Sequence, residues 1–331
     1  MNRYRIHISD DEISRMPIPA MVAAVDGALR ALGCGMIDNP PRSETVGRPD
    51  DPDFFQIDMQ AAYLGRGYRC RKVIEEHGAR DEAGNRLPGL RRTWIEFEDP
   101  VREARVTLDA EFITNVRTAI AALLGARYLL PEGRPVSLAL IGTGRIAREV
   151  VRCAPNVIDV RWIRATSRNR ERREAFASRM QEQVSVEIRA AESVSECVED
   201  ADVVIAAVPS SEPVLSFEEC KGAGHISLVG GDPRVVLADR ALWEQSAIVV
   251  DNPAQARKSG DLVRAFREQW FDSIRFARIG SDESTLADAS LGRLDERREE
   301  RTMLLLTGIA TFDLALTRLA YERRLASEST P

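Results

Sequence analysis

The chain has 331 residues, enough for two domains that each bury a core of their own. Its 52 acidic and 46 basic residues give a formal net charge of −6, which argues against a nucleic-acid or anionic-membrane partner. The five cysteines form no C-x-x-C pair and the three histidines are scattered, so we expect neither a disulfide framework nor a metal site. No apolar stretch is long enough to span a membrane, and the N-terminus lacks the apolar core of a signal peptide, so we expect a cytoplasmic protein.

The first third of the chain shows the alternation of antiparallel strands, with a helical pattern before it and another after it. We expect helices over Ala20–Leu32 and Ala110–Leu130. The other expected elements are strands at Tyr4–Ile8, Phe54–Leu64 and Gly67–Glu75, a polar loop at Asp81–Pro88, and a hairpin of Leu90–Glu98 with Glu103–Leu108.

From Val136 onward, strand patterns alternate with helix patterns such as Arg170–Met180. The expected strands are Val136–Ile141, Val160–Thr166, Val184–Ile188, Val203–Ala207, Gly224–Val229 and Ile248–Asp251. Alternation at this spacing predicts a parallel, doubly wound sheet of the Rossmann type, with ligands at the carboxyl ends of its strands. A last helix, Gly308–Leu325, is expected to return to the first domain.

A glycine-rich turn, Gly142-x-Gly144-x-x-Ala147, joins the first of these strands to a helix. The first glycine permits the turn, the second lets the backbone approach a pyrophosphate, and the alanine allows close helix–strand packing. The alternative is an ordinary strand–helix turn. We predict a dinucleotide site that uses residues at three strand ends, namely Gly142, Thr143, Gly144, Arg145, Ile146, Val208, Pro209, Ser210 and Gly230.

The end of the second strand lacks the acidic residue that usually binds the ribose 2′-hydroxyl of NAD. Ser167, Arg168 and Arg170 occupy that region instead, and no acid appears before Glu171. A hydroxyl and two guanidinium groups suit a 2′-phosphate, so the sequence favours NADP(H) and leaves NAD(H) possible. The alternative is that these arginines merely lie on a solvated helix start.

With these residues placed, the chain resembles the ornithine cyclodeaminase/μ-crystallin family. The resemblance rests on motifs along nearly the whole chain, among them Pro40-Pro-Arg42, Met59-Gln-Ala-Ala-Tyr-Leu64, Lys72, Val116-Arg-Thr-Ala119, Ile141-Gly-Thr-Gly144, Pro209-Ser210, Val229-Gly-Gly-Asp232 and Gly308-Ile-Ala-Thr-Phe-Asp313. It implies an α/β fold with a Rossmann-type NAD(P)-binding domain over residues 118–307. It also implies an α+β substrate-binding and dimerisation domain over residues 1–117 plus about 308–331, formed by the N-terminal part and the C-terminal helix.

The resemblance also implies roles for individual residues. Arg42 and Arg117 match the family's arginines for a substrate α-carboxylate, and Met59 falls in the same substrate site. Lys72 matches the active-site lysine, and Asp232 matches the catalytic aspartate. The simpler alternatives are salt bridges for the arginines, a lysine that reaches solvent, and a turn or helix-capping aspartate.

The implied function is an NAD(P)-dependent oxidoreductase that acts on the C–N bond of an amino or imino acid through hydride transfer at Cα. One alternative is an ornithine cyclodeaminase-type lyase that releases ammonia with catalytic NAD. Another is a μ-crystallin-like NADP-binding protein with little turnover. A homodimer is implied in each case. Ala122, the stretch Pro233–Ala238 and the compressed segment Leu291–Arg301 depart from the family pattern, which puts ornithine itself in doubt as the substrate.

Overall fold

The structure is a computed structural model, and it describes residues 5–80, 86–131, 133–294 and 301–328. The chain divides into two compact units. Unit 1 comprises Met1–Arg117 and Ile309–Pro331, and unit 2 comprises Thr118–Gly308. Unit 1 holds a mixed sheet with helices and unit 2 a parallel sheet with helices, so the predicted α/β fold class is confirmed.

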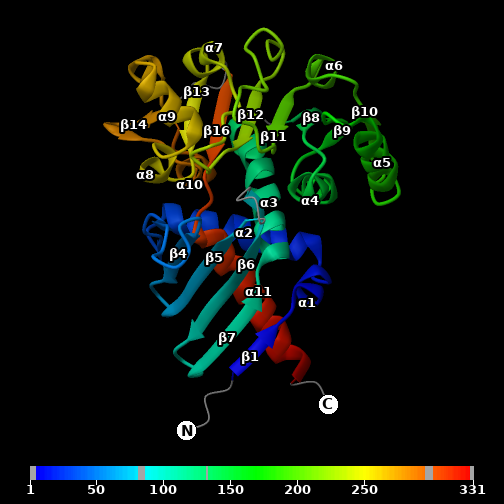
Figure 1. Cartoon of the computed structure of the whole chain (residues 1–331). Helices are drawn as coiled ribbons and strands as arrows, with labels where there is room; N and C mark the ends of the chain where they lie inside the picture. Colours follow the sequence, from blue (N-terminus) through cyan, green and yellow to red (C-terminus); the bar gives the residue numbers. More distant parts are fainter. Residues whose placement is uncertain (1–4, 81–85, 132, 295–300, 329–331) are drawn as a thin grey trace. The chain divides into compact units, whose positions relative to one another are not determined.

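Unit 1 is built on a seven-stranded sheet in the order β1-β7-β6-β5-β4-β2, in which β3 also pairs with β4 (Figure 1). The β1–β7 pair is parallel and the other pairs are antiparallel. The strands are β1 Arg5–Ile8, β2 Ile37–Asp38, β3 Ser43–Val46, β4 Phe55–Tyr63, β5 Tyr68–Arg80, β6 Arg86–Asp99 and β7 Ala104–Asp109. The strand expected at Phe54–Leu64 and the hairpin around Asp99 are confirmed.

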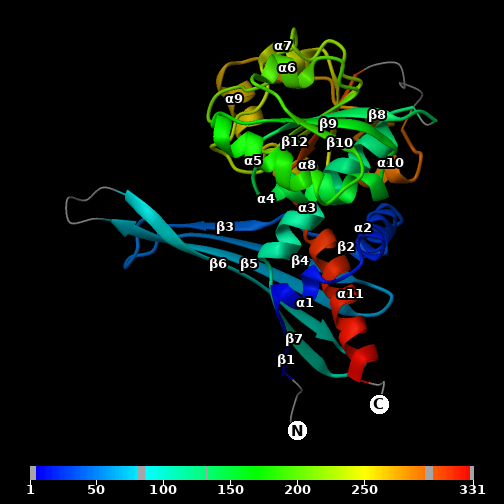
Figure 2. The same cartoon turned by 90° about the vertical axis from the view of Figure 1, so that its right-hand side faces the viewer.

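The β5–β6 ribbon is longer than the sequence predicts, and Figure 2 shows it as an extended arm of the sheet. Strand β6 begins at Arg86, so the expected loop is wrong for Arg86–Pro88, while residues 81–85 lie outside the described part. The pairs Ala79↔Leu87 and Arg80↔Arg86 continue the ladder there. Backbone pairing does not require apolar side chains, so polarity alone is a poor signal for a loop.

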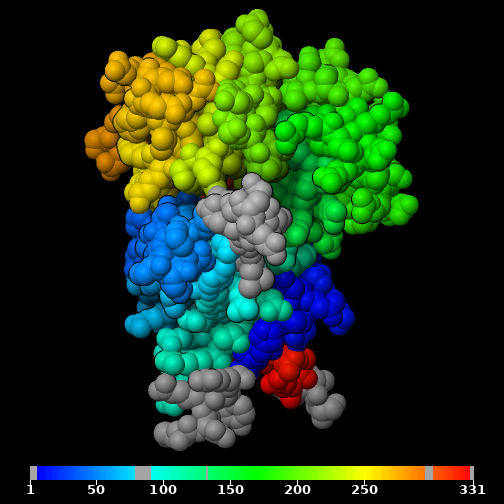
Figure 3. All heavy atoms as spheres, in the orientation of Figure 1, coloured from blue at the N-terminus to red at the C-terminus, as the bar shows by residue number. Residues whose placement is uncertain are grey.

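Four helices accompany this sheet. They are α1 Asp10–Ser14, α2 Ile18–Gly33, α11 Ala310–Glu328, and α3 Glu111–Leu129, which continues into unit 2. Helix α11 packs on β4, β5, β6 and α2, so the two ends of the sequence share one core. Figure 3 shows the last residues of α11 beside the N-terminal segment, where Arg324 Nη1 lies 2.6 Å from Glu12 Oε1.

Alternate residues of the unit 1 strands are buried, as expected for a sheet covered on one face. One row of partners crosses four strands: Met59 faces Lys72, Lys72 faces Ile95, and Ile95 faces Leu108. All four side chains are buried. A lysine therefore occupies a buried position whose neighbours in the row are all apolar.

Unit 2 has a second seven-stranded sheet, in the order β10-β9-β8-β11-β12-β16-β13 with every pair parallel. The strands are β8 Val136–Ile141, β9 Val160–Thr166, β10 Glu187–Ala190, β11 Val203–Ala206, β12 His225–Val229, β13 Ala247–Val250 and β16 Thr302–Leu306. The accompanying helices are α4 Arg145–Cys153, α5 Arg170–Gln181, α6 Val194–Val198, α7 Arg240–Glu244, α8 Pro253–Ala256, α9 Gly260–Arg267 and α10 Leu286–Ser290, and a short ribbon is formed by β14 Arg278–Ile279 and β15 Asp282–Glu283.

Two strands of unit 2 differ from the prediction. Strand β10 is Glu187–Ala190 rather than Val184–Ile188, because the ladder with β9 begins only at the Glu187–Trp162 pair. Strand β16 was not predicted, although all its residues are buried between β12 and β13. Its short apolar run, Thr302–Leu306, stands just before a glycine and a helix, and periodicity cannot separate such a run from the start of that helix.

A histidine is buried at the amino end of the β12–β16 pair. His225 Nδ1 lies 2.8 Å from Thr302 Oγ1, and its Nε2 lies 2.9 Å from Ser227 Oγ, which donates to the Ala122 carbonyl. Because no acid of the described residues pairs with this ring, burial lowers the pKa of His225 to about 3. The native unit therefore requires the neutral imidazole.

We predict that this histidine makes unit 2 less stable in acid. The unfolded chain binds a proton at His225 near pH 6.5 and the folded chain only near pH 3, so stability is lost as the pH falls through that window. Between pH 7.5 and 4.5 the loss is about 2–3 kcal/mol. Denaturant titrations of His225→Gln should lack this component, whereas His7→Gln, which changes an exposed histidine, should keep it. Equal pH slopes in both variants would show that His225 is not the group responsible.

Candidate functional site

Lys72 is the most unusual side chain of unit 1 because it is completely buried at the centre of β5. Its Nζ lies 2.9 Å from Oδ1 of Asp313, in the first turn of α11. Burial lowers the pKa of Lys72 to about 8, and the neighbouring carboxylate opposes that shift. The alternative of a strand lysine that reaches solvent is therefore excluded. A buried lysine of this kind can exchange a proton near neutral pH.

Arg117 lies next to this pair. Its Nε is 3.6 Å from the same Asp313 oxygen, and its side chain is only 7% exposed. One carboxylate thus faces two buried cations, which leaves one positive charge over when all three groups are ionised. Neither Arg117 Nε nor Asp313 Oδ2 has a hydrogen-bond partner within the described residues. Buried polar atoms are ordinarily hydrogen-bonded, so the cluster is suited to binding an anionic polar group.

Two more of the predicted substrate-binding residues lie on the same face of the sheet. Met59 is the direct cross-strand partner of Lys72. Arg42 precedes the Ser43↔Asp58 pair, which places it at the level of Met59. Its Nε and Nη2 both lie 2.8 Å from Glu44 Oε1. Met59 and Lys72 are therefore partners on β4 and β5, Arg42 directly precedes β3 at the same level, and Asp313 links Arg117 to Lys72.

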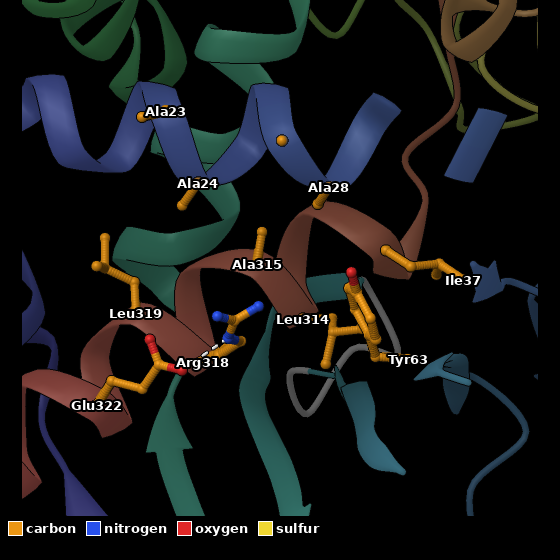
Figure 4. Close-up of a pocket in the computed structure, with 11 residues that line it drawn as sticks. Ala23, Ala24, Ala28, Ile37, Tyr63, Leu314, Ala315, Arg318, Leu319 and Glu322 are labelled. Carbon is orange, nitrogen blue, oxygen red and sulfur yellow. Dashed lines mark hydrogen bonds and ion pairs between the residues drawn. The ribbon is translucent and has the colours of Figure 1, made fainter. Parts of the chain in front are cut away.

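Unit 1 also has a hollow between α2 and α11, of about 350 Å³ (Figure 4). Small side chains of α2, such as Ala24 and Ala28, face Leu314 and Ala315 of α11. The charged groups in its wall, Arg318 and Glu322, are paired with each other at 2.8 Å. None of the predicted site residues lines it. An amino acid bound in this hollow would therefore not contact the buried charges of Lys72, Arg117 and Asp313.

In unit 2 the predicted nucleotide-binding residues lie at the carboxyl ends of the parallel strands. The turn Gly142–Gly144 follows β8, Ser167 and Arg168 follow β9, Val208–Ser210 follow β11, and Gly230 follows β12. Strands β8 and β11 are neighbours in the sheet. The strands that follow β8 lie on one side of this pair and those that follow β11 lie on the other. Sheets of this kind bind ligands at such a switch in strand order.

The glycine turn combines a tight backbone with open space. Gly142 has φ +116°, and a Cβ there would lie 2.7 Å from the Ala207 carbonyl oxygen. A Cβ at Gly144 would meet nothing within 4 Å, and no side chain caps helix α4, which begins at Arg145. Open space beside an uncapped helix N-terminus suits a pyrophosphate.

The end of β9 carries the residues expected to select the nucleotide. Ser167 and Arg168 come directly after the strand, and Arg170 begins α5. Arg170 Nε lies 2.7 Å from Glu174 Oε1, as expected for a residue on a solvated helix start. Arg173, which the sequence did not single out, is buried and donates to the Ser167 carbonyl at 3.2 Å. This bond fixes the turn that carries Ser167 and Arg168.

Asp232 follows β12 and forms a two-pronged ion pair with Arg234, at 2.9 Å to Nε and 2.6 Å to Nη2. The Arg234 amide also donates to Asp232 Oδ1. Asp232 therefore stabilises a turn, which is the simpler role named above for this residue. The turn is closely packed, because a Cβ on Gly231 would lie 2.5 Å from the Thr307 carbonyl oxygen.

A buried carboxylate holds the loop that departs from the family pattern. Asp261 accepts hydrogen bonds from the amides of Leu237 and Ala238 and from Trp243 Nε1. Burial raises the pKa of Asp261 to about 6. A Cβ on Gly260 would lie 2.2 Å from the Val235 carbonyl oxygen, so α9 and this loop are in direct backbone contact.

Within the described ranges, no group of three or more His, Cys, Asp or Glu side chains is placed to hold a metal ion. The helices of the same part of the chain include none that is long and apolar enough to cross a membrane. All five cysteines are free thiols, and burial raises the pKa values of Cys153, Cys197 and Cys220 to about 12. These three thiols are therefore unsuited to nucleophilic chemistry.

The whole chain can be compared with known protein families. The model of the ornithine cyclodeaminase/mu-crystallin family matches residues 9–328. The chain belongs to this family.

Relatives within the family carry out related reactions. Alanine dehydrogenase of Archaeoglobus fulgidus is 26% identical over 311 residues, which are 92% of this chain and 89% of that protein. Ketimine reductase mu-crystallin of Mus musculus is 30% identical over 238 residues, 71% of this chain and 70% of its own. Among solved structures, the Thermococcus litoralis Δ1-pyrroline-2-carboxylate reductase in complex with NADH and L-proline has a TM-score of 0.82 at 23% identity, and 98% of each chain is covered.

The structure adds two acids that the sequence analysis of this family member did not single out. Asp313 stands at the end of the quoted motif Gly308–Asp313 among apolar neighbours, and an acid in such a setting indicates a buried partner. Glu44 follows Arg42 by two residues on a strand, which places both on one face. Spacing could have suggested Glu44, but the pairing of Asp313 with Lys72 spans 241 residues and needs the structure.

The two loop glycines make a paired prediction about nucleotide binding. Gly142→Ala should destabilise unit 2 by about 1–3 kcal/mol, because the residue needs a positive φ and its Cβ would meet the Ala207 carbonyl. Gly144→Ala should leave the free protein nearly as stable as wild type and weaken NAD(P)H binding at least about tenfold, because the methyl group enters the space of the pyrophosphate. Thermal unfolding and NAD(P)H fluorescence titration separate the two effects. Unchanged affinity in Gly144→Ala would argue against a dinucleotide at this loop.

Proposed function

We propose that the protein is an NAD(P)-dependent oxidoreductase that acts on the C–N bond of an amino or imino acid. The observation that carries this proposal is the buried cluster of Lys72, Arg117 and Asp313, which has an excess positive charge in a chain of this family. A surplus cation on the substrate-binding sheet fits a single carboxylate, and the glycine loop of unit 2 fits a dinucleotide.

In this proposal the substrate carboxylate is bound by the cationic groups of unit 1. The guanidinium groups of Arg42 and Arg117 offer planar forks of N–H donors that match a carboxylate, and Lys72 adds a point charge. Met59 would contact the apolar part of the substrate beside Lys72. Anchoring the carboxylate orients the neighbouring Cα–N bond, which is what a hydride transfer at Cα requires.

The bound nicotinamide would supply the redox step by accepting or donating a hydride at the substrate Cα. Unit 2 would hold this cofactor with Gly142, Thr143, Gly144, Arg145 and Ile146, and with the strand-end residues Val208, Pro209, Ser210 and Gly230. Ser167, Arg168 and Arg170 favour NADP(H), because these residues offer a 2′-phosphate hydrogen-bond donors and positive charge while a carboxylate would repel it.

Proton transfer has two candidate residues. The pKa of Lys72, near 8, allows this side chain to take a proton from a substrate ammonium or return one to an imine near neutral pH. Asp232 is the other candidate, since its carboxylate is partly exposed at the end of β12. Loss of the amine proton, hydride transfer and attack of water on the resulting imine would give a keto acid and ammonia. The reverse sequence would reduce an imino acid.

A second candidate function is a cyclodeaminase, and Glu44 is the observation that favours it. This carboxylate lies beside Arg42, on the face of the sheet that carries Lys72. A substrate with a side-chain ammonium, such as a diamino acid, needs a nearby anion of this kind. Attack of the side-chain amine on the imine, followed by return of the hydride, would release ammonia without net oxidation. A binding protein with little turnover has no comparable observation in its favour, because Lys72 and Asp232 are both present.

We further propose that the protein is a homodimer formed through unit 1, as the family resemblance implies. The sheet face opposite Lys72 carries charged pairs, such as Arg71 with Asp58 and with Glu96 at 3.4 Å, that a second copy can complement. Sedimentation equilibrium at micromolar concentration should therefore report twice the monomer mass of 36.8 kDa. A monomer at all concentrations would contradict this proposal.

The activity itself is tested by measuring two products in the same reaction. Purified protein with oxidised NADP, and with NAD in parallel, is given a panel of L-amino acids that includes alanine, proline and ornithine. We expect reduced cofactor and ammonia in equal amounts with at least one neutral amino acid, and a higher kcat/KM with NADP than with NAD.

Other outcomes separate the alternatives. Ammonia without reduced cofactor would establish the cyclodeaminase and overturn the dehydrogenase. If both signals are absent, cyclic imino acids with reduced cofactor test the reductase direction. Cofactor binding without any turnover in either direction would favour the binding-protein alternative.

A further inference from the structure

The strongest unassigned group in the molecule is the carboxylate of Asp313. It is completely buried, its Oδ1 faces both Lys72 and Arg117, and nothing in the proposed reaction uses it as an acid or base. Two cations that share one carboxylate repel each other, and each loses favourable hydration on burial. Without a counter-ion, Lys72 would lose its proton and Arg117 would turn towards solvent.

We propose that Asp313 is the positioning residue of the substrate-binding unit. Its carboxylate holds Lys72 and Arg117 at fixed points so that both can bind one substrate carboxylate. This inference rests on the proposed function, because it assigns Lys72 and Arg117 to the substrate.

The fold brings Asp313 to this point through one helical turn. Helix α11 packs across β4, β5 and β6, and its first turn carries Asp313 over Lys72. Asn39 fixes the same turn, because its Oδ1 accepts from the Thr311 amide at 2.8 Å and from the Thr311 hydroxyl at 2.9 Å. Asn39 stands three residues before Arg42. The start of α11 therefore connects to the segments that carry Arg42, Lys72 and Arg117.

The charge and the hydrogen bonding of the cluster both leave room for a ligand. One carboxylate neutralises one of the two cations, so a monocarboxylate would complete the balance. The Nε of Arg117 is buried and has no hydrogen-bond partner in the described chain, so it can donate to such a group.

The test uses the small number of lysines in this chain. Only Lys72, Lys221 and Lys258 are present, so a protein labelled with ¹³C- and ¹⁵N-lysine gives three side-chain signals, which Lys72→Met assigns. The pKa of Lys72 is read directly from a pH titration. Asp313→Asn should lower it by about 1–3 units, because the variant removes the only counter-ion within 4 Å that the described residues give Lys72.

A matched control exists in the same unit. Asp99 is also completely buried, with an ion pair to Arg102 at 3.0 Å and a hydrogen bond from Tyr321. Asp99→Asn therefore removes a buried charge at comparable structural cost. It should leave the pKa of Lys72 unchanged. Equal pKa values of Lys72 in wild type and in a folded Asp313→Asn protein would overturn the proposal.

A second arm follows ligand binding through the same signal. Pyruvate, a simple monocarboxylate, should shift the Lys72 signal of the wild type, and its affinity should fall at least about tenfold in Asp313→Asn. If that variant does not fold, Asp313→Glu keeps the charge but displaces it by one methylene group. The proposal then requires weakened pyruvate binding with Lys72 still charged, and wild-type affinity in Asp313→Glu would contradict it. Neither arm needs turnover, so both remain decisive if the proposed reaction proves wrong.

Discussion

The structure of unit 1 depends on a lysine and an arginine that share one carboxylate inside the protein. Lys72 lies between Met59 and Ile95 in a row of buried side chains, where an unpaired ammonium would be strongly unfavourable. The ion pair with Asp313 makes this position tolerable, and it can form only if the C-terminal helix crosses the sheet. The arrangement of α11 on β4, β5 and β6 is therefore as much an electrostatic requirement as a matter of apolar packing.

Unit 2 uses buried acids for a different purpose, which is to hold loops. Asp261 binds the amides of Leu237 and Ala238, and Asp251 accepts from the amides of Thr307 and Gly308. In each case a carboxylate satisfies backbone donors that no strand or helix satisfies. These loops flank the turn that carries Asp232, so the catalytic candidate sits on backbone that is held from two sides. The rigidity of the loop thus comes from side chains distant in the sequence.

The sequence predicted the parallel sheet well because its strands are continuous apolar runs followed by glycine or polar turns. The tight turn at Gly142 was predictable for the same reason, since its positive φ is a matter of local backbone geometry. The prediction failed where contacts between residues distant in the sequence determine the structure. Strand β16 is a short apolar run directly before a helix, and Arg86 and Leu87 belong to a ribbon because their backbone pairs with β5. Asp313 was visible only as part of a motif, because its partner Lys72 is remote in the chain.

Strand β16 has a consequence for the order in which the protein can be completed during translation. Among the described residues it is the last strand of unit 2 in the sequence, yet it stands between β12 and β13 and is the one strand with which β13 pairs in the sheet. Helix α11 follows directly and closes unit 1. A nascent chain that has reached residue 290 therefore has two unfinished cores and an unpaired strand edge. Neither unit is therefore complete before this closing segment has been synthesised, and until then the edge of β12 lacks its neighbour in the sheet.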